Sequence, residues 1–313
     1  MLINKLASDK KLFYSKTLFY DSARESFGDI LDYFYYEENI KTIFMPAYIG
    51  ISPKEGSGLY DPIKNRQYIK PIFYKINYDL TINQKDLFKK VNNYNSKFLL
   101  LFVNYFGFID PQICMIYEFI KKHNGYLIED NAHAFFTHFN QKNIFSDISF
   151  FSLHKQFPFE NGGMLKIYNN QIDSCKFNGK IFPKDDYNFL NYSFINIQNK
   201  MIQNYVILNN KLLTEKDYIK ILRPNICGGI VPQSFPVLLE IGDRFRIYQI
   251  LNNEGYGVTS LYHTLIEPLR KSEFKDSLNI SSKILNFPTH QDVNIDMIDN
   301  MINTLKIYFE RYI

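Results

Sequence analysis

The chain has 313 residues, of which 46% are hydrophobic, and its formal net charge at pH 7 is +4. This composition is sufficient for one large domain and one smaller domain with a substantial core, and it excludes a largely disordered chain. The basic residues form no long run and are nearly matched in number by Asp and Glu, so we expect no nucleic-acid partner.

The N-terminal segment MLINKLASDKKLFYSK lacks an uninterrupted apolar stretch, and no later segment approaches the length of a membrane span. The three cysteines, Cys114, Cys175 and Cys227, are far apart and outside any CxxC spacing, which argues against a disulfide framework and against a zinc site. We therefore expect a soluble, cytoplasmic protein with no membrane partner and no metal.

The first half of the chain alternates between helical and extended patterns. Asp21 or Ser22 is the predicted N-cap of a helix, which precedes a short strand over residues 42–45. The continuous apolar run KFLLLFVNY, residues 97–105, is typical of a strand buried on both faces. A helix is predicted over residues 111–123, with Gly125 as its stop signal, and another buried strand over residues 126–129. This alternation predicts βαβ units, an α/β fold class and a mostly parallel sheet.

The second half has a different character. After one more predicted strand, MLKIY, residues 169–188 are polar and rich in Asn and Lys, and we place the domain boundary there. Residues 189–213 carry apolar positions at helical spacing and predict a bridging helix. The expected division is therefore a large α/β domain over residues 1–188, with an N-terminal arm, and a small α+β domain over residues 189–313.

The residues between 126 and 165 carry the clearest chemical signal. One apolar strand delivers Asp130 into a turn, and a second delivers Lys155 ahead of Gly162 and Gly163. Pyridoxal phosphate (PLP) requires a lysine for its Schiff base and an acidic partner for its pyridinium nitrogen. Taken alone, Asp130 is also compatible with a turn or N-cap residue and Lys155 with a solvated lysine. Their location at the carboxyl ends of strands favours a ligand site.

Several blocks in order carry a resemblance to a known family: SAR, MPAYIG, LLLFVNYFG, YLIEDNAHAF, SFFSLHK followed by GG, VPQSFPV and ILNFPTHQDV. Over nearly its whole length the chain resembles the DegT/DnrJ/EryC1/StrS family of PLP-dependent nucleotide-sugar aminotransferases. The resemblance implies fold type I, with a seven-stranded, mostly parallel sheet and a small α+β C-terminal domain. It also implies a homodimer whose active site lies at the subunit interface.

The resemblance assigns expected roles to three residues near the central signal. Lys155 would form the Schiff base and shuttle the proton, and Asp130 would pair with the pyridinium nitrogen. His133, three residues after the acid, stands where the family more usually has Gln, and it would contact the ring hydroxyl. A hydrogen-bonded loop histidine is an equally open interpretation of His133.

The expected phosphate site is a departure from the family pattern. Ser22 and Ala23 would bind the phosphate at a helix N-terminus, although simple N-capping by Ser22 remains an alternative. Phe150 stands five residues before the lysine, where the family usually has a phosphate-binding serine. Ser152 or Ser149 would have to replace it, and we expect Ser152.

Two further features follow from the same comparison. Tyr48 in MPAYIG would stack on the pyridine ring, with a core tyrosine as the alternative interpretation. The middle segment, residues 169–213, is shorter than in most family members, where it reaches the neighbouring subunit's active site. The residue that would reach from one subunit into the active site of the other is therefore not assigned.

The expected function is transfer of an amino group from an amino acid, with glutamate as the expected donor, to a keto sugar nucleotide in glycan or deoxyaminosugar biosynthesis. Two alternatives stay open. One is a PLP enzyme of the same fold with another reaction, such as a sugar dehydratase, although that branch typically has histidine in place of the lysine. The other is a non-catalytic family member with a binding or regulatory role.

Overall fold

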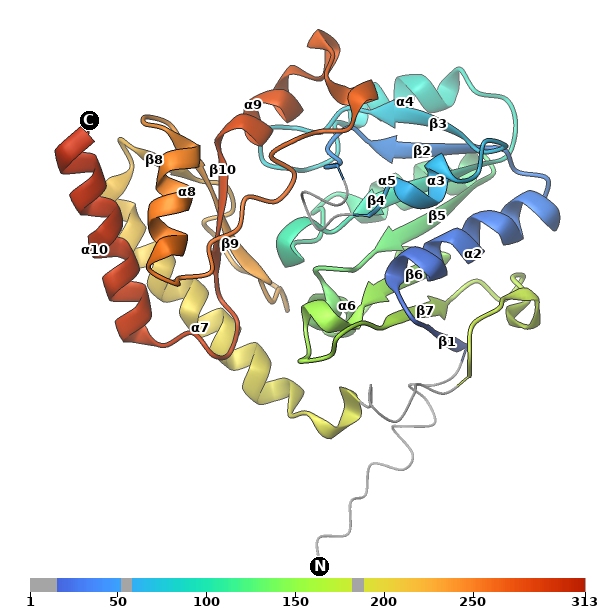
Figure 1. Ribbon diagram of the computed structural model, residues 1–313. Helices are drawn as coiled ribbons and strands as arrows, with labels where there is room; N and C mark the ends of the chain where they lie inside the picture. Colours follow the sequence, from blue (N-terminus) through green and yellow to red (C-terminus); the bar gives the residue numbers. More distant parts are fainter. Residues whose placement is uncertain (1–15, 52–57, 182–188, 313) are drawn as a thin grey trace, which may run out of the picture.

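The computed structural model of the protein describes residues 16–51, 58–181 and 189–312 (Figure 1). The beginning of the predicted N-terminal arm, residues 1–15, and the predicted domain boundary at residue 188 lie outside the described residues. Two sheets form the framework of the described chain, and they are built from different halves of the sequence.

The larger sheet has seven strands in the order β1-β7-β6-β5-β4-β2-β3. The five strands from β2 to β6 are parallel to their neighbours among themselves, whereas β7 runs antiparallel to both β6 and β1. The predicted α/β class with a mostly parallel seven-stranded sheet is thus confirmed. The strands are β1 (Thr17–Tyr20), β2 (Thr42–Pro46), β3 (Lys70–Tyr74), β4 (Phe98–Val103), β5 (Gly125–Asp130), β6 (Ile148–Ser152) and β7 (Gly163–Ile167).

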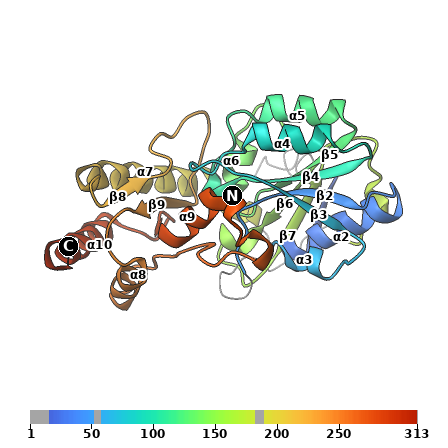
Figure 2. The same cartoon turned by 90° about the horizontal axis from the view of Figure 1, so that it is seen from above.

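Helices cover both faces of this sheet, and Figure 2 shows α2 and α3 on one side of it and α4 and α5 on the other. Both faces of the central strands are therefore buried, which explains the continuous apolar run in β4. The helices of this half are α2 (Ala23–Tyr36), α3 (Asp61–Lys64), α4 (Gln84–Asn92), α5 (Ile113–Lys122) and α6 (Phe135–Phe139), with 3₁₀ turns η1 (Tyr105–Gly107), η2 (Leu153–Lys155) and η3 (Ser174–Lys176).

The smaller sheet has three antiparallel strands in the order β10-β9-β8. The long helix α7 leads from the larger sheet toward it, and α8 and α10 lie beside it (Figure 1). Its strands are β8 (Ile219–Ile221), β9 (Ser234–Leu239) and β10 (Ile284–Pro288). Its helices are α7 (Phe194–Leu212), α8 (Arg244–Asn253), α9 (Lys275–Lys283) and α10 (Ile295–Tyr312), with 3₁₀ turns η5 (Phe189–Asn191), η6 (Leu213–Glu215), η7 (Glu267–Leu269) and η8 (Ser272–Phe274).

Direct contacts join the two halves near the carboxyl ends of the central strands. The guanidinium of Arg223, which follows β8, donates to the backbone oxygens of Asp79 and Ile109, at 3.2 Å each. An antiparallel bridge pairs Gly50 with Leu265. These contacts bring a loop of the smaller half to the edge where β5 and β6 end.

Several local predictions can be compared with the structure. Ser22 is the N-cap of α2, because its Oγ accepts a hydrogen bond from the backbone N–H of Glu25. Gly125 is not a helix stop but the first residue of β5, and the left-handed turn before it is taken by Asn124, at φ 57°. The bridging helix begins at Phe194, five residues later than predicted, because a separate 3₁₀ turn comes first.

Among the described residues, no helix combines the length and the apolar character that a membrane span needs. The three cysteines are exposed and form no disulfide with one another. No group of three or more metal-binding side chains occurs within the described ranges.

Candidate active site

A cavity of about 230 Å³ lies at the carboxyl ends of the neighbouring strands β5 and β6. Five of the residues predicted from the sequence line it, namely Ser22, Ala23, Asp130, Ser152 and Lys155. The other lining residues are Arg24, Phe27, Gly58, Leu59, Ala132, Phe150, His154 and Tyr262. The parallel arrangement of β5 and β6 thus brings the carboxylate and the amine of the central sequence signal into one site.

Asp130 is the last residue of β5 and is almost completely buried. The backbone N–H of Ala132 donates to its Oδ1 at 2.8 Å, which holds the carboxylate in a tight turn at the strand end. Burial raises the pKa of Asp130 to about 6, although this hydrogen bond and the charge of Lys155 oppose the rise. A carboxylate in this environment has no strong cationic partner within the described part of the fold. It would therefore favour a ligand that brings a positively charged group into the cavity.

Lys155 ends the 3₁₀ turn η2, which follows β6 directly. Its Nζ lies 3.0 Å from Nε2 of His133. Burial lowers the pKa of Lys155, and the positive charge of Arg24 adds to this effect while Asp130 opposes it. A lowered pKa increases the fraction of neutral amine, which is the nucleophilic form.

The N-terminus of α2 forms one wall of the cavity. Ala23 and Arg24 are its first two residues, and backbone N–H groups at such positions have no partner within the helix. The helix dipole adds a partial positive charge at this end. The Arg24 guanidinium is more than half exposed and lies 3.5 Å from the carboxylate of Asp61. Together these groups make the wall suitable for an anion such as a phosphate.

The Gly-Gly pair allows this helix end to approach the turn that carries Lys155. The N–H of Gly162 donates to the backbone oxygen of Asp21, and its own backbone oxygen accepts from Leu153. A Cβ atom on Gly163 would lie only 2.3 Å from the backbone carbon and oxygen of Ser22. Only glycine therefore fits at residue 163 without displacing the start of α2.

Phe150, which stands where a phosphate-binding serine was expected, is part of the cavity lining. Its ring stacks on Phe27 of α2 with a centroid distance of 5.1 Å, so this wall is apolar. Ser152 lines the cavity, and its Oγ lies 3.2 Å from Nδ1 of His154. Ser149 instead donates from the opposite face of β6 to Glu129. The structure thus places Ser152, and not Ser149, at the cavity.

The tyrosine on the cavity wall is Tyr262 rather than the predicted Tyr48. Tyr48 is fully buried behind it, packs on the Tyr262 ring at 5.1 Å and donates to the backbone oxygen of Leu261 at 3.3 Å. Tyr262 comes from the loop between α8 and α9 of the smaller half. No local pattern marks this residue, since its proximity depends on how the two halves pack.

Two histidines flank Lys155. His133 does not line the cavity but lies behind it, where it is nearly fully buried and contacts the amine. Strand alternation in SFFSLHK predicts that His154 lies on the face opposite to Lys155, as a structural residue, yet it lines the cavity. The predicted side is wrong because β6 ends at Ser152 and the 3₁₀ turn replaces strand alternation.

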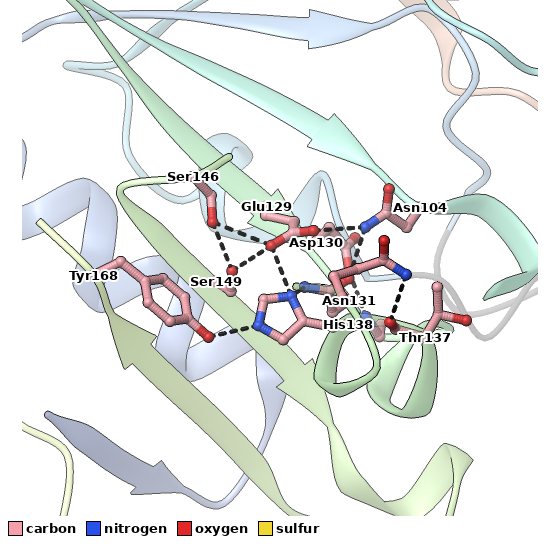
Figure 3. A network of polar contacts seen from close by, with 11 residues as sticks. Asn104, Glu129, Asp130, Asn131, Thr137, His138, Ser146, Ser149 and Tyr168 are labelled. Carbon is pink, nitrogen blue, oxygen red and sulfur yellow. Dashed lines mark hydrogen bonds and ion pairs between the residues drawn. The ribbon is translucent and has the colours of Figure 1, made fainter. Parts of the chain in front are cut away.

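A buried polar network lies behind Asp130, on the other face of the sheet (Figure 3). The carboxylate of Glu129 contacts Nδ1 of His138 at 3.0 Å and accepts a hydrogen bond from Ser149 at 2.5 Å. The amide of Asn104 donates to Glu129 at 2.8 Å and to Asn131 at 2.7 Å. This network joins the ends of β4 and β5 and the beginning of β6 to α6, and so supports the turn that contains Asp130 and His133.

Comparisons with known proteins give a consistent result. Residues 65–176 match the model of the DegT/DnrJ/EryC1/StrS aminotransferase family. None of the curated proteins matches the sequence at a significant level. Solved structures match over almost the whole chain, although the sequence identities are low.

The structure is similar to that of a putative sugar aminotransferase, Spr1654 from Streptococcus pneumoniae, in its PLP form, with a TM-score of 0.76, 14% identity and coverage of 99% of this chain and 91% of that one. It is also similar to Helicobacter pylori PseC, an aminotransferase involved in the biosynthesis of pseudoaminic acid, with a TM-score of 0.75, 16% identity and coverage of 95% and 87%. The Escherichia coli GDP-4-keto-6-deoxy-D-mannose-3-dehydratase with bound hydrated PLP gives a TM-score of 0.72, 15% identity and coverage of 95% and 90%.

Proposed function

Because the chain has the PLP-dependent fold type I and resembles the DegT/DnrJ/EryC1/StrS aminotransferases in sequence and structure, we propose that it is a PLP-dependent aminotransferase. One observation carries this proposal. The amine of Lys155 and the carboxylate of Asp130 line a single cavity that is bounded by the N-terminus of α2.

The residues present fit this cofactor in three respects. The buried Asp130 carboxylate could accept a hydrogen bond from a protonated ring nitrogen, and such a partner would lower its raised pKa. The backbone N–H groups of Ala23 and Arg24 could bind a phosphate. The close approach of Gly163 to Ser22 keeps that helix end beside the turn of Lys155.

Each of these groups has a distinct task in the proposed reaction. When bound, PLP supplies an electron sink for the carbanion that forms at the substrate carbon. Lys155 holds the cofactor and moves a proton on and off the substrate carbon. Asp130 keeps the ring nitrogen protonated, and Tyr262 closes the cavity on its side. Ser152 would donate its hydroxyl to the phosphate in place of the serine that Phe150 replaces.

For the substrates, we propose a keto sugar nucleotide as amino acceptor and glutamate as amino donor. The support is the similarity to sugar aminotransferases, among them PseC. Lys155 adds to it, because the family resemblance implies that the dehydratase branch typically has histidine at this position. We also propose a cytoplasmic homodimer that works in glycan or deoxyaminosugar biosynthesis. The exposed apolar residues Ile195 and Val206 on α7 are compatible with such a partner contact.

The cofactor proposal can be tested by reconstitution. Purified protein incubated with PLP should gain an absorbance band in the visible or near-ultraviolet region, and borohydride should bleach it and leave a pyridoxyl adduct on the peptide that contains Lys155. The variant Lys155→Ala should show no adduct. Lys166→Ala is the matched control, because Lys166 is a partly buried lysine on the neighbouring strand β7, outside the cavity lining, and burial lowers its pKa to about 8.

The reaction itself can be tested by incubating the holoenzyme with glutamate and a panel of keto sugar nucleotides. Formation of 2-oxoglutarate together with a sugar product that has gained an amino group would support the proposed transfer. A sugar product that has lost a hydroxyl and gained no amino group would indicate a dehydratase. Protein that takes up no PLP would contradict the enzyme proposal and favour a binding role.

A further inference from the structure

His133 lies between a backbone donor and the side chain of Lys155. The N–H of Phe106 donates to Nδ1 of the imidazole at 3.4 Å, and Nε2 on the other side of the ring lies 3.0 Å from Nζ of Lys155. The histidine ring is nearly parallel to the Phe106 ring, at 14°, with a centroid distance of 5.8 Å. The imidazole is thus fixed in orientation by a donor on one side and an amine on the other.

The backbone donor is itself held in place by an unusual turn. Phe106 has a φ of 59°, a left-handed conformation that is rare for a large side chain and is found where the surrounding structure imposes it. Its backbone oxygen accepts from Gln233, and the Thr137 hydroxyl donates to the next oxygen, that of Gly107, at 2.7 Å. A Cβ on Gly107 would meet the Val231 oxygen at 2.5 Å, so the smaller half of the chain packs tightly against this turn.

These contacts determine which nitrogen of His133 carries the proton. A backbone N–H can only donate, so Nδ1 must be the unprotonated acceptor. Burial lowers the pKa of His133 well below its ordinary value, so the ring is neutral near pH 7. Any positive charge on Lys155 would lower this pKa further and would not reverse the conclusion. A neutral imidazole has one N–H, which is therefore on Nε2 and faces the lysine.

An Nε2–H group can form a hydrogen bond with a neutral amine but not with an ammonium. The neutral Nζ has a lone pair that accepts this proton, whereas a protonated Nζ offers donors alone and would face another donor at 3.0 Å. We propose that His133 acts as a positioning residue that keeps Lys155 neutral, and so ready to bind a carbonyl cofactor, by donating from a fixed tautomer. This inference rests on the proposed role of Lys155 as the amine that holds the cofactor.

Other groups also face Lys155, and they act by a different mechanism. Asp130 from β5 favours the ammonium, whereas Arg24 from α2 disfavours it, and His154 is on the same turn. All three act through charge or polarity across the cavity. The contact with His133 differs because it has a direction, and its effect depends on a single hydrogen atom. A variant that fills the same space without this hydrogen separates the two contributions.

The test measures the titration of Lys155 in the protein freed of cofactor. Trace labelling with acetic anhydride at a series of pH values, read by peptide mass spectrometry, gives the midpoint for Lys155 against the exposed Lys85 on α4. His133→Met fills a similar space but has no N–H donor, and we expect it to raise the midpoint by about one pH unit, which corresponds to one typical hydrogen bond. His133→Gln retains a donor and should stay near the wild-type midpoint.

With methionine at residue 133, the direction in which the Lys155 midpoint shifts decides between the two explanations. Methionine is less polar than histidine, so desolvation alone would lower the midpoint further. An unchanged or lowered midpoint in His133→Met would therefore overturn the inference. His123→Gln, next to the end of α5, is the control for a histidine substitution away from the site and should leave the midpoint unchanged.

A second measurement needs no variant. Nitrogen chemical shifts of histidine-labelled wild-type protein should show His133 with a protonated Nε2 and an unprotonated Nδ1 across the neutral pH range. A protonated Nδ1 or an imidazolium would overturn the inference even if the variants fail to fold. Because both measurements use protein without cofactor, a failure to take up PLP would contradict the proposed function but would leave these results interpretable.

Discussion

Glu129 and Asp130 are consecutive carboxylates at the end of β5, and the sheet directs them into opposite environments. Burial would raise the pKa of Glu129, but His138 and the hydrogen bonds from Ser149 and Asn131 outweigh it and bring the pKa to about 2. Asp130 has no comparable partners, and burial brings its pKa to about 6. One carboxylate is thus satisfied within the fold, while the other is left for a ligand.

The substitution Glu129→Gln is expected to destabilise the protein by about 3 kcal/mol at pH 7, because it removes a buried charge from its partners. The folded-state pKa is below the ordinary value of 4.5, so the stabilisation is present above pH 4.5 and is lost as the pH falls toward about 2. The difference in unfolding free energy between the two proteins can be measured by urea denaturation, at pH 7 and at the lowest pH where both remain folded. A penalty that does not shrink with pH would contradict the interpretation.

Tyr168→Phe is the matched control for this network. The Tyr168 hydroxyl lies 2.5 Å from Nε2 of His138, on the side of that ring away from Glu129. Its removal should cost about 1 kcal/mol, the contribution of one hydrogen bond, with little change between the two pH values.

The substitution Asp130→Asn should have the opposite effect on stability. In the folded protein without cofactor Asp130 binds its proton more tightly than in the unfolded chain, so stability falls as the pH rises from 3.8 to about 6. The amide side chain does not ionise, so the variant does not lose stability in this pH range. Without cofactor, its free energy of unfolding at pH 7.5 should exceed that of the wild type by about 2 to 3 kcal/mol. Denaturation curves should show that the difference in unfolding free energy between the two proteins decreases below pH 6. The affinity for PLP should be lower in the variant than in the wild type. Equal stability of the two proteins at pH 7.5 would refute the argument.

Gly163→Ala is expected to weaken PLP binding by roughly tenfold or more, since each 1.4 kcal/mol of strain at the binding site costs a factor of ten. The new Cβ would displace the backbone of Ser22, which starts the proposed phosphate-binding helix. Equilibrium titration with PLP provides the measurement. Gly28→Ala, in the same helix, meets the Arg66 side chain and not a backbone atom, and Gly28 lies outside the cavity lining, so this variant should retain wild-type affinity.

Arg24→Gln should weaken the binding of pyridoxal phosphate but not of pyridoxal, because the guanidinium lines the cavity beside the proposed phosphate site. The expected loss is about three- to fivefold, as the side chain is more than half exposed and solvent screens its charge. In the wild type, the preference for pyridoxal phosphate over pyridoxal should also decrease with added salt. Asp61→Asn removes the partner of Arg24 and should leave phosphate affinity equal or slightly higher. An equal loss for both ligands would rule out the phosphate contact.

The central part of the site could be predicted from the sequence because it is local. Asp130 ends one buried apolar strand and Lys155 comes shortly after another, and neighbouring parallel strands end at the same edge. Tyr262 could not be predicted, because it reaches the cavity only through the packing of the two halves. In a chain with 24 Tyr and 29 Phe, the choice between Tyr48 and Tyr262 has no local basis.

The error at His154 has a similar origin. Strand alternation was extended two residues too far, since nothing in SFFSLHK marks the point where β6 gives way to a 3₁₀ turn. Likewise, Asn124 takes the left-handed turn that glycine was expected to take, and Gly125 is required instead by the Phe98 ring, which lies 2.7 Å from where a Cβ would be. Such choices depend on contacts with residues distant in sequence.

The pairing of β1 with β7 has a consequence for how the protein is made. The strand β1, which precedes the other described strands, can find its partner only after residues 163–167 have left the ribosome, and α2 starts three residues after β1 ends. Contacts of such long sequence separation form slowly, because the intervening loop must close first. The end of α2 that we propose binds the phosphate should therefore be assembled late in folding. A fragment that ends before Gly163 retains the sequence of the parallel strands β2 to β6 but should not form the proposed cofactor site.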